Sequence, residues 1–243
     1  MPFPYAALVS TCRADSASPR LTWYDRSGGP SDGERVELSG RLLLMWANKA
    51  ANLLLEEHDV APGTRVALAL PVHWRACYWA LACWALGATV SADPDAADVV
   101  VTDDSRLADR VPERSILVTL PALARRAPQE PPASAIDEAA TISGYPDDLS
   151  MPGDPSPEDV ALDFPERHTT YREMSVEATR ESDPTGERLL LDGDLGAVLQ
   201  DAARTWARSG SVLLIAGGNA EQRTTVMASE RASVRRGGPT PSR

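Results

Sequence analysis

Residues 63–91, GTRVALALPVHWRACYWALACWALGATVS, form the most apolar stretch of this 243-residue chain. The apolar run within it, residues 76–90, is shorter than the roughly 20 residues that a membrane-spanning helix needs. Residues 65–70 have the pattern of a short strand that ends at a proline, and residues 74–86 are apolar on nearly every face of a helix. A second strand pattern follows at residues 89–91. The stretch therefore predicts a right-handed βαβ unit with a parallel sheet, and no membrane span.

Strand and helix patterns alternate along the rest of the chain. Strands are expected at residues 20–25, 34–38, 98–102, 115–120, 160–164, 188–191 and 211–216, the first two forming a hairpin. Helices are expected at residues 5–14, after the cap Ser39 as far as residues 56–59, and at residues 105–110, 171–180, 195–208 (capped by Asp194) and 221–231. This alternation favours an α/β fold, mainly parallel sheet with flanking helices.

Composition changes in the middle of the chain and at its end. Residues 126–158 are rich in proline and acidic residues, as in a long loop or linker, with one helix expected near residues 134–142. This segment separates a first α/β unit, residues 1–125, from a second, residues 159–231. Residues 232–243 are expected to form a disordered tail, because Gly, Pro and Arg dominate its sequence.

The net charge of −11 restricts the partners of the chain. An acidic protein repels the phosphates of nucleic acids and of anionic membranes, so we expect neither as a partner. The N-terminus lacks the pattern of a signal peptide, which makes the cytoplasm the expected location. The three cysteines, Cys12, Cys77 and Cys83, do not form a disulfide pattern, and we expect buried thiols in a reducing compartment.

Several segments carry a family pattern. SGRLLLMWANKAANLLLEEHDV contains an R-x-x-x-x-A-N-x-L type helix pattern, APGTRVALALP matches a "pGdrVal-l-p" strand, and YWALACWALGATV matches an "a-lA-l-aGAv" helix. ADVVVTDD, SPEDVALDF and WARSGSVLLIAGGNAEQRTTVMASERAS match later segments more weakly. With these segments the chain resembles a shortened N-terminal subdomain of adenylate-forming enzymes, the AMP-dependent acyl-CoA synthetase superfamily. It is most similar to short actinobacterial relatives of those enzymes, and the resemblance implies their α/β fold.

The chain departs from the family where the family holds ATP. Family members carry a Ser/Thr/Gly-rich loop ending in Pro-Lys-Gly, whose N–H groups, hydroxyls and lysine bind the phosphates. After residues 160–162 this chain has DFPERHTTYREMSVEA, which contains no glycine and no lysine. The acidic Asp163, Glu166 and Glu173 in that segment would repel phosphate. The only lysine of the chain, Lys49, lies in the helix that follows Ser39, and the family's C-terminal-domain lysine and Tyr-Gly-x-Thr-Glu motif have no counterpart.

Other candidate motifs have simpler explanations. They are Thr185-Gly186-Glu187 (similar to a ribose motif), Gly217-Gly218-Asn219 (a possible phosphate loop), Asp192-Gly193-Asp194 (a possible cation loop) and His168 with Glu166, Tyr171 and Glu173 (a possible acid–base cluster). We interpret the first three as turns or a helix cap and the last as a solvated loop. The spacing of His58, His73 and His168 predicts no metal site. We therefore predict no catalytic, cofactor-binding or metal-ligating residue.

Two functions of different classes follow. The first is a catalytically inactive scaffold that binds a small apolar or acyl ligand, or another protein, without a cofactor. The alternative is a residual AMP-binding ligase, completed by a partner subunit and using ATP or AMP with magnesium. Residues 163–172 discriminate between them. Converging N–H groups there would favour the enzyme, whereas a helical or closed segment would favour the binding protein.

Overall fold

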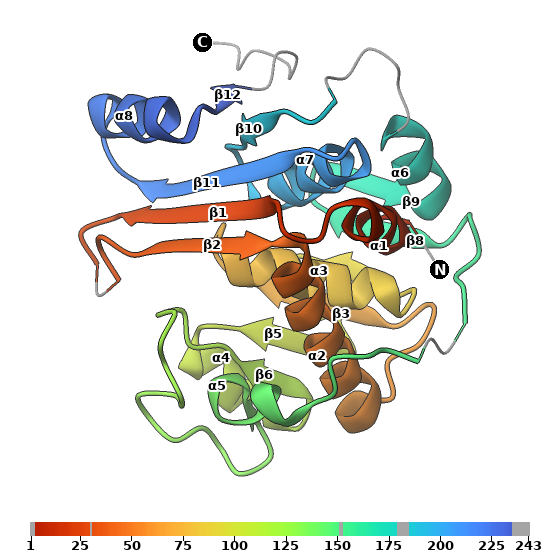
Figure 1. The fold of residues 1–243 in the computed structure, drawn as a ribbon. Coiled ribbons are helices and arrows are strands. Elements are labelled where there is room, and N and C mark those ends of the chain that lie inside the picture. Colours follow the sequence, from red (N-terminus) through yellow and green to blue (C-terminus); the bar gives the residue numbers. More distant parts are fainter. Residues whose placement is uncertain (1–2, 30, 151–152, 179–184, 235–243) are drawn as a thin grey trace.

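A computed structural model describes residues 3–29, 31–150, 153–178 and 185–234 of the chain, and Figure 1 shows its fold. The described strands form two β-sheets, one above the other in this view, with helices between and around them. None of the helices in these ranges combines the length and apolar character needed to cross a membrane.

The five-stranded sheet combines the two ends of the chain. Its strands are β1 (Pro19–Arg26), β2 (Arg35–Ser39), β10 (Arg188–Leu190), β11 (Ser211–Gly217) and β12 (Ser233–Val234). Their order is β12-β10-β11-β1-β2. All neighbours are parallel except β1 and β2, which form the predicted antiparallel hairpin.

The seven-stranded sheet contains the middle of the chain. Its strands are β3 (Arg65–Ala69), β4 (Thr89–Ser91), β5 (Val99–Thr102), β6 (Ser115–Leu117), β7 (Ile136–Asp137), β8 (Val160–Phe164) and β9 (Arg167–Thr170). Their order is β7-β6-β5-β3-β4-β8-β9, parallel throughout except for the last pair. The prediction of an α/β fold with a mainly parallel sheet is therefore confirmed.

The helices begin close to where the sequence predicts them. They are α1 (Tyr5–Ala14), α2 (Gly40–His58), α3 (Trp74–Ala85), α4 (Ser105–Arg110), α5 (Glu138–Thr141), α6 (Tyr171–Ala178), α7 (Leu195–Ala207) and α8 (Ala220–Glu230), with 3₁₀ turns at Pro112–Arg114 and Ile142–Gly144. The predicted caps are confirmed, since the Ser39 side chain accepts the Leu42 N–H and the Asp194 side chain accepts the Ala197 N–H.

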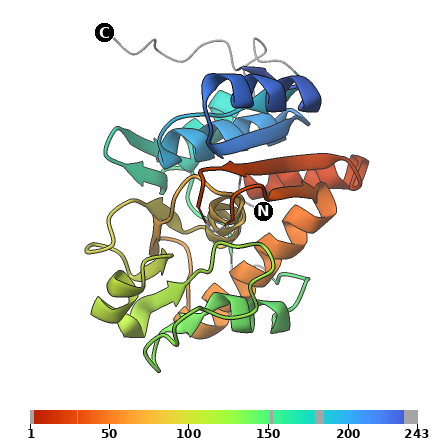
Figure 2. The same ribbon diagram turned by 90° about the vertical axis from the view of Figure 1, so that its left-hand side faces the viewer.

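Helix α3 lies between the two sheets and is seen end-on in Figure 2. All of its residues are buried, as the apolar pattern of residues 74–86 predicts. It connects β3 to the parallel β4, which confirms the βαβ unit. Trp84 is fully buried and its indole Nε1 donates to the Ala161 carbonyl oxygen at 2.8 Å, so helix α3 is also tied to β8.

Strand pairing interleaves the two units predicted from composition. β1, from residues 1–125, pairs along its length with β11, and β8 and β9, from residues 159–231, extend the sheet of β3 and β4. The predicted linker, residues 126–158, adds β7 to the seven-stranded sheet. The strands of each sheet therefore come from more than one of these segments. Of the tail predicted at residues 232–243, Ser233 and Val234 form β12, and the part from residue 235 lies outside the described residues.

Two boundaries differ from the prediction. The helix expected near residues 134–142 is the short strand β7 followed by the single-turn α5, because Glu138 turns into the interior instead of continuing an exposed helix. The strand expected at residues 115–120 ends at Leu117. Beyond it, the carbonyl oxygens of Leu120 and Pro121 accept hydrogen bonds from the side chain of Arg75, which draws this segment away from the sheet.

Candidate functional site

The segment that follows β8 forms a closed hairpin. Phe164 pairs with Arg167 in the antiparallel ladder of β8 and β9, so that Pro165 and Glu166 make a two-residue turn. The chain then enters α6 at Tyr171. A hairpin directs its main-chain groups into the strand ladder, whereas a phosphate-binding loop points several N–H groups at one ligand.

The carboxylate of Asp163 organises the base of the hairpin. Its Oδ2 lies 2.6 Å from the Arg65 Nη2 and its Oδ1 lies 3.2 Å from the His168 Nδ1. The same Arg65 nitrogen is 3.4 Å from the Ser91 hydroxyl oxygen. The hydrogen bond from Arg65 lowers the pKa of Asp163, assisted by His168 and opposed by partial burial. Asp163 is therefore ionised at neutral pH and offsets the positive charge of Arg65.

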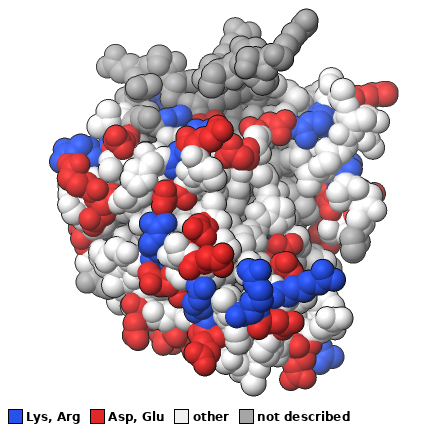
Figure 3. Space-filling view, turned by 180° about the vertical axis from the view of Figure 1, so that it is seen from behind, with Lys and Arg blue, Asp and Glu red and all other residues white. Residues whose placement is uncertain are grey.

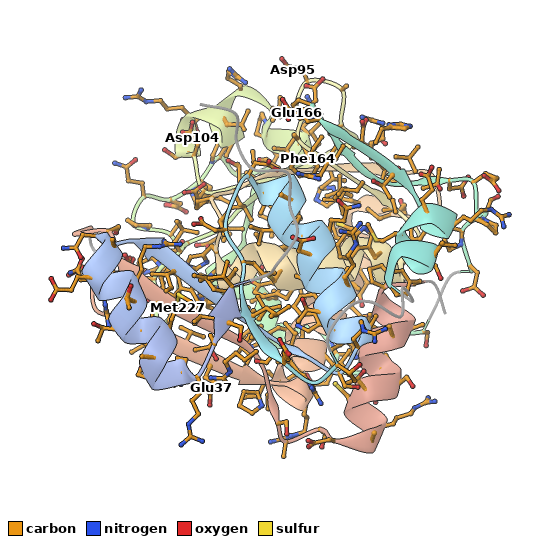
Figure 4. The ribbon with its side chains drawn as sticks, turned by 90° about the horizontal axis from the view of Figure 1, so that it is seen from above. Glu37, Asp95, Asp104, Phe164, Glu166 and Met227 are labelled. Carbon is orange, nitrogen blue, oxygen red and sulfur yellow. The ribbon has the colours of Figure 1, made fainter. Side chains whose placement is uncertain are left out.

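The tip of the hairpin packs on the first turn of α7. A Cβ atom built at Gly196 would lie only 2.7 Å from the Phe164 ring, so the ring rests directly on this glycine. Figure 4 shows Phe164 at this end of α7, with Glu166 and Asp95 beyond it. Arg167 hydrogen-bonds the Gln200 side chain at 3.2 Å. Phe164 and the capping carboxylate of Asp194 thus both lie at the N-terminus of α7, where a negatively charged side chain is favourable.

A cavity of about 860 Å³ adjoins the hairpin and the carboxyl end of β4. Its charged lining residues are Arg65, Asp93, Asp163, Glu166, Arg167 and His168. Both arginines have carboxylate partners, since Arg65 pairs with Asp163 and the Arg167 Nε lies 3.9 Å from Asp194. The exposed Glu166 adds negative charge. This charge arrangement opposes the binding of a polyphosphate.

The side chain of Lys49 contacts residues 143–147. Its ammonium group donates to the carbonyl oxygens of Ser143 (3.0 Å) and Tyr145, and it lies 2.9 Å from a carboxylate oxygen of Asp147. The side chain is 13% exposed. Lys49 thus fixes residues 143–147 against α2.

The residues proposed as an acid–base cluster do not converge. His168 is mostly exposed and contacts Asp163, whereas the Tyr171 hydroxyl is buried and donates to the Ala88 carbonyl oxygen at 2.8 Å. Glu173 accepts from the N–H and hydroxyl of Thr170 at the start of α6.

The glycine pair after β11 has a steric role. Gly217 and Gly218 both have positive φ, +65° and +78°, which favours glycine. A Cβ at Gly217 would also lie 2.7 Å from the Ser27 Cα, so this glycine lets β11 approach the loop after β1. Asn219 then caps α8 together with Gln222, as predicted for a strand-to-helix turn.

The remaining motifs also act in turns. Asp192 pairs with Arg223 at 2.7 Å, and Asp194 caps α7. Gly186 has a φ of +72°, and the Thr185 hydroxyl accepts from Arg208.

Among the described residues, no three His, Cys, Asp or Glu side chains are grouped so that they could hold a metal ion. The three cysteines are free and buried, and burial raises the pKa of the Cys12 thiol to about 11 and that of Cys77 to about 12. At neutral pH these thiols are therefore protonated and poor nucleophiles. His73 caps α3 through its Nδ1, and burial, with the charge of Arg75, lowers its pKa to about 3.

Sequence reasoning missed a buried ionic cluster between α3 and α5. The Arg75 guanidinium lies 3.2 Å from Glu138 Oε1, and the Tyr78 hydroxyl bonds the same carboxylate. Glu138 and Tyr78 are fully buried, and Arg75 is 3% exposed. Burial raises the pKa of Glu138 and Tyr78. The pKa of Arg75 is also raised, because the interactions with Tyr78 and Glu138 outweigh the lowering effect of burial. The only sequence signal was a charged residue in an otherwise apolar helix.

Comparison with known proteins places this fold among solved structures. No protein-family model matches the chain. The acyl-CoA synthetase of Brucella canis is 17% identical with a TM-score of 0.71, and the match covers 94% of this chain and 46% of that one. The coronafacic acid ligase of Pectobacterium brasiliense is 13% identical with a TM-score of 0.74, covering 96% and 49%. The N-terminal domain of FACL13 from Mycobacterium tuberculosis is 17% identical with a TM-score of 0.66, covering 96% and 62%.

One curated protein of Mycobacterium tuberculosis, strain H37Rv, is 40% identical over 104 residues. Its name states family membership and no activity. The match covers 43% of this chain and 41% of that protein, so the chain spans less than two thirds of the relatives and structures it resembles. The resemblance to the N-terminal region of acyl-CoA synthetases is confirmed, and the fold is that of this region of adenylate-forming enzymes.

Proposed function

We propose that the chain is a catalytically inactive binding domain built on the N-terminal fold of adenylate-forming enzymes. The hairpin at residues 163–168 is the observation that carries this proposal. It follows the strand whose sequence resembles the segment before the family's phosphate-binding loop. Asp163 and Phe164 close it, and Arg65 and Arg167 each have a carboxylate partner. A closed segment at this position favours a binding protein over a residual ligase.

The ligand we propose is a small apolar or acyl molecule. A cavity of about 440 Å³ lies outside the carboxyl ends of β5 and β6. Half of its lining residues are apolar, namely Leu117, Val118, Leu120, Pro121 and Pro128, and the other half are Ser31, Asp103, Ser105, Thr119 and Gln129. In open α/β sheets, ligands bind at this edge. The volume and apolar lining are those of a small-molecule pocket. No nucleotide cofactor is part of this function.

The alternative, a ligase completed by a partner subunit, draws support from the solved structures, of which this chain spans about half. In that case a partner would have to supply the phosphate-binding groups, because the charges at the hairpin oppose ATP.

A thermal-shift screen with ATP-Mg, AMP, CoA, an acyl-adenylate analogue and a medium-chain fatty acid distinguishes the two, since a ligand of the native state raises the melting temperature. We expect stabilisation by the fatty acid and none by the nucleotides. Leu120→Trp, which fills the cavity, should abolish the fatty-acid shift. Val176→Trp, at an exposed position of α6, is the control and should keep it. Stabilisation by ATP-Mg, or a fatty-acid shift that survives Leu120→Trp, would contradict the proposal.

A further inference from the structure

Arg20, near the start of β1, is a buried cation whose hydrogen bonds go only to the main chain. It is 6% exposed, and its Nη atoms donate to the carbonyl oxygens of Ser209, of Gly210 at 3.4 Å and of Asp15 at 3.5 Å. Within residues 3–29, 31–150, 153–178 and 185–234, it forms no salt bridge. Its Nε is buried without a hydrogen-bond partner. Buried charges in proteins are normally paired, so this guanidinium lacks a full counter-charge.

The neighbouring groups neutralise Arg20 only in part. Ser209 and Gly210 follow the end of α7, and a helix C-terminus carries about half of a negative elementary charge. The Asp15 carboxylate interacts with Arg20 electrostatically, but its oxygens accept hydrogen bonds from the Ser18 hydroxyl and from two main-chain N–H groups. None of these contacts uses the Nε of Arg20.

A cavity of about 450 Å³ adjoins Arg20 at the amino ends of β1, β10 and β11. Ser211, the first residue of β11, also lines it, and its hydroxyl is buried without a partner. Arg188 lines it from β10, with its own guanidinium paired to Glu230. The cavity thus brings together an incompletely neutralised guanidinium and an unused hydroxyl, and such unpaired buried groups call for an ion or water.

We propose that this cavity binds a small phosphate-type oxyanion, which acts as the counter-charge of Arg20. A guanidinium presents a planar fork of donors that matches phosphate oxygens, and a serine hydroxyl adds a further donor. The cavity is larger than a single phosphate, so a phosphorylated small molecule fits as well.

The anion site is separate from the hairpin of residues 163–168. Phe164 of the hairpin packs on Gly196 at the start of α7, whereas Ser209 follows the end of the same helix. A helix of 13 residues is about 20 Å long. The anion site can therefore be tested without disturbing the hairpin.

Inorganic phosphate is the probe, and its affinity is measured by thermal titration and by ³¹P NMR line broadening. Sodium chloride and sodium acetate at the same ionic strength and pH serve as comparisons. We expect phosphate to raise the melting temperature above the chloride value. Ser211→Ala and Arg20→Lys should each weaken phosphate binding at least tenfold.

Matched controls lie at the first residue of β6 and at the last residue of the 3₁₀ turn before it. Ser115→Ala changes another serine that begins a parallel strand, and Arg114→Lys changes another arginine whose side chain donates to main-chain carbonyl oxygens, those of Pro94 and Ala97. Both controls should bind phosphate like the wild type. The proposal is overturned if phosphate stabilises no more than chloride, if acetate alone stabilises, or if Ser211→Ala binds phosphate unchanged. If Arg20→Lys fails to fold, the phosphate affinity of Ser211→Ala alone tests the proposal.

Discussion

Glu138 and Arg75 are buried charged residues, and the contribution of each to the free energy of unfolding depends on the presence of the other. Each makes further hydrogen bonds, the carboxylate with Tyr78 and the guanidinium with the carbonyl oxygens of Leu120 and Pro121. Removing one partner of a buried pair leaves an uncompensated charge, which costs about 3–5 kcal/mol. We therefore expect Glu138→Gln to lower the free energy of unfolding by that amount, measured by urea denaturation.

An exposed pair supplies the control for this measurement. Arg172 and Glu158 lie 2.6 Å apart with side chains 59% and 68% exposed. Surface pairs contribute about 0–1 kcal/mol, so Glu158→Gln should change stability little. Equal effects of Glu158→Gln and Glu138→Gln would show that burial of the Arg75 partner has no energetic consequence.

The ion pair of Asp163 with Arg65 should make the free energy of unfolding depend on pH. Arg65 lowers its pKa below that of the unfolded chain, so its contribution is fully present above the ordinary carboxyl range and is lost as the pH falls through the lowered pKa. We expect wild type to exceed Asp163→Asn in stability by a constant difference, at most about 1 kcal/mol, between pH 7 and about pH 5. That difference should shrink below about pH 4. A difference that grows on acidification would have the wrong sign.

At the scale of elements, polar side chains of α2 hold residues 143–148 in place by donating hydrogen bonds to the main-chain carbonyl oxygens of that segment. Asn52 donates to the carbonyl oxygens of Pro146 (3.0 Å) and Asp148 (2.9 Å), and Asn48 donates to that of Asp147. Asn52→Ala removes two hydrogen bonds, each worth about 0.5–1.5 kcal/mol, and should therefore cost about 1–3 kcal/mol. Hydrogen exchange should become faster at residues 143–150. Arg41→Ala, at an exposed position of the same helix, should leave that exchange unchanged.

The turn from β11 to α8 depends on Gly217. An alanine at Gly217 would have to adopt a positive φ and would also clash with the backbone of Ser27. An alanine at Gly33 would have to adopt a positive φ of +88° but would clash with nothing. Gly33→Ala should cost about 1–2 kcal/mol for the left-handed conformation. Gly217→Ala should cost about 1–3 kcal/mol more, for overpacking. Thermal unfolding of the two variants gives the comparison, and equal losses would mean that β11 can move away from the loop.

Most elements of the fold were predictable because their signals are local. Apolar runs such as residues 99–101, and caps such as Ser39 and Asp194, lie within the elements that they define. The hairpin of residues 163–168 was not predicted, because Arg167 and His168 lack a strand pattern and owe their place to the ladder with β8. The burial of Glu138 was equally inaccessible, since its partner Arg75 lies 63 positions away in the sequence.

For the molecule as a whole, the pairing of β1 with β11 links the two α/β units that composition predicts. The five-stranded sheet pairs residues about 190 positions apart in the sequence, such as Leu21 with Val212. The amino-acid composition of a segment does not indicate which distant strand it pairs with. The acidic net charge is spread, and Figure 3 shows acidic and basic side chains interspersed on one face. The absence of nucleic-acid and membrane partners, and the cytoplasmic location, stay predictions.

The central claim is that the closed hairpin has replaced the phosphate-binding loop and with it adenylation. ATP–pyrophosphate exchange tests this most directly, using the purified 243-residue chain, magnesium, radiolabelled pyrophosphate and a panel of short, medium and aromatic carboxylic acids. An active acyl-CoA synthetase assayed in parallel establishes sensitivity. We predict exchange no faster than in reactions without protein, for every acid. Acid-dependent exchange above that background, lost on heat denaturation of the chain, would contradict the claim.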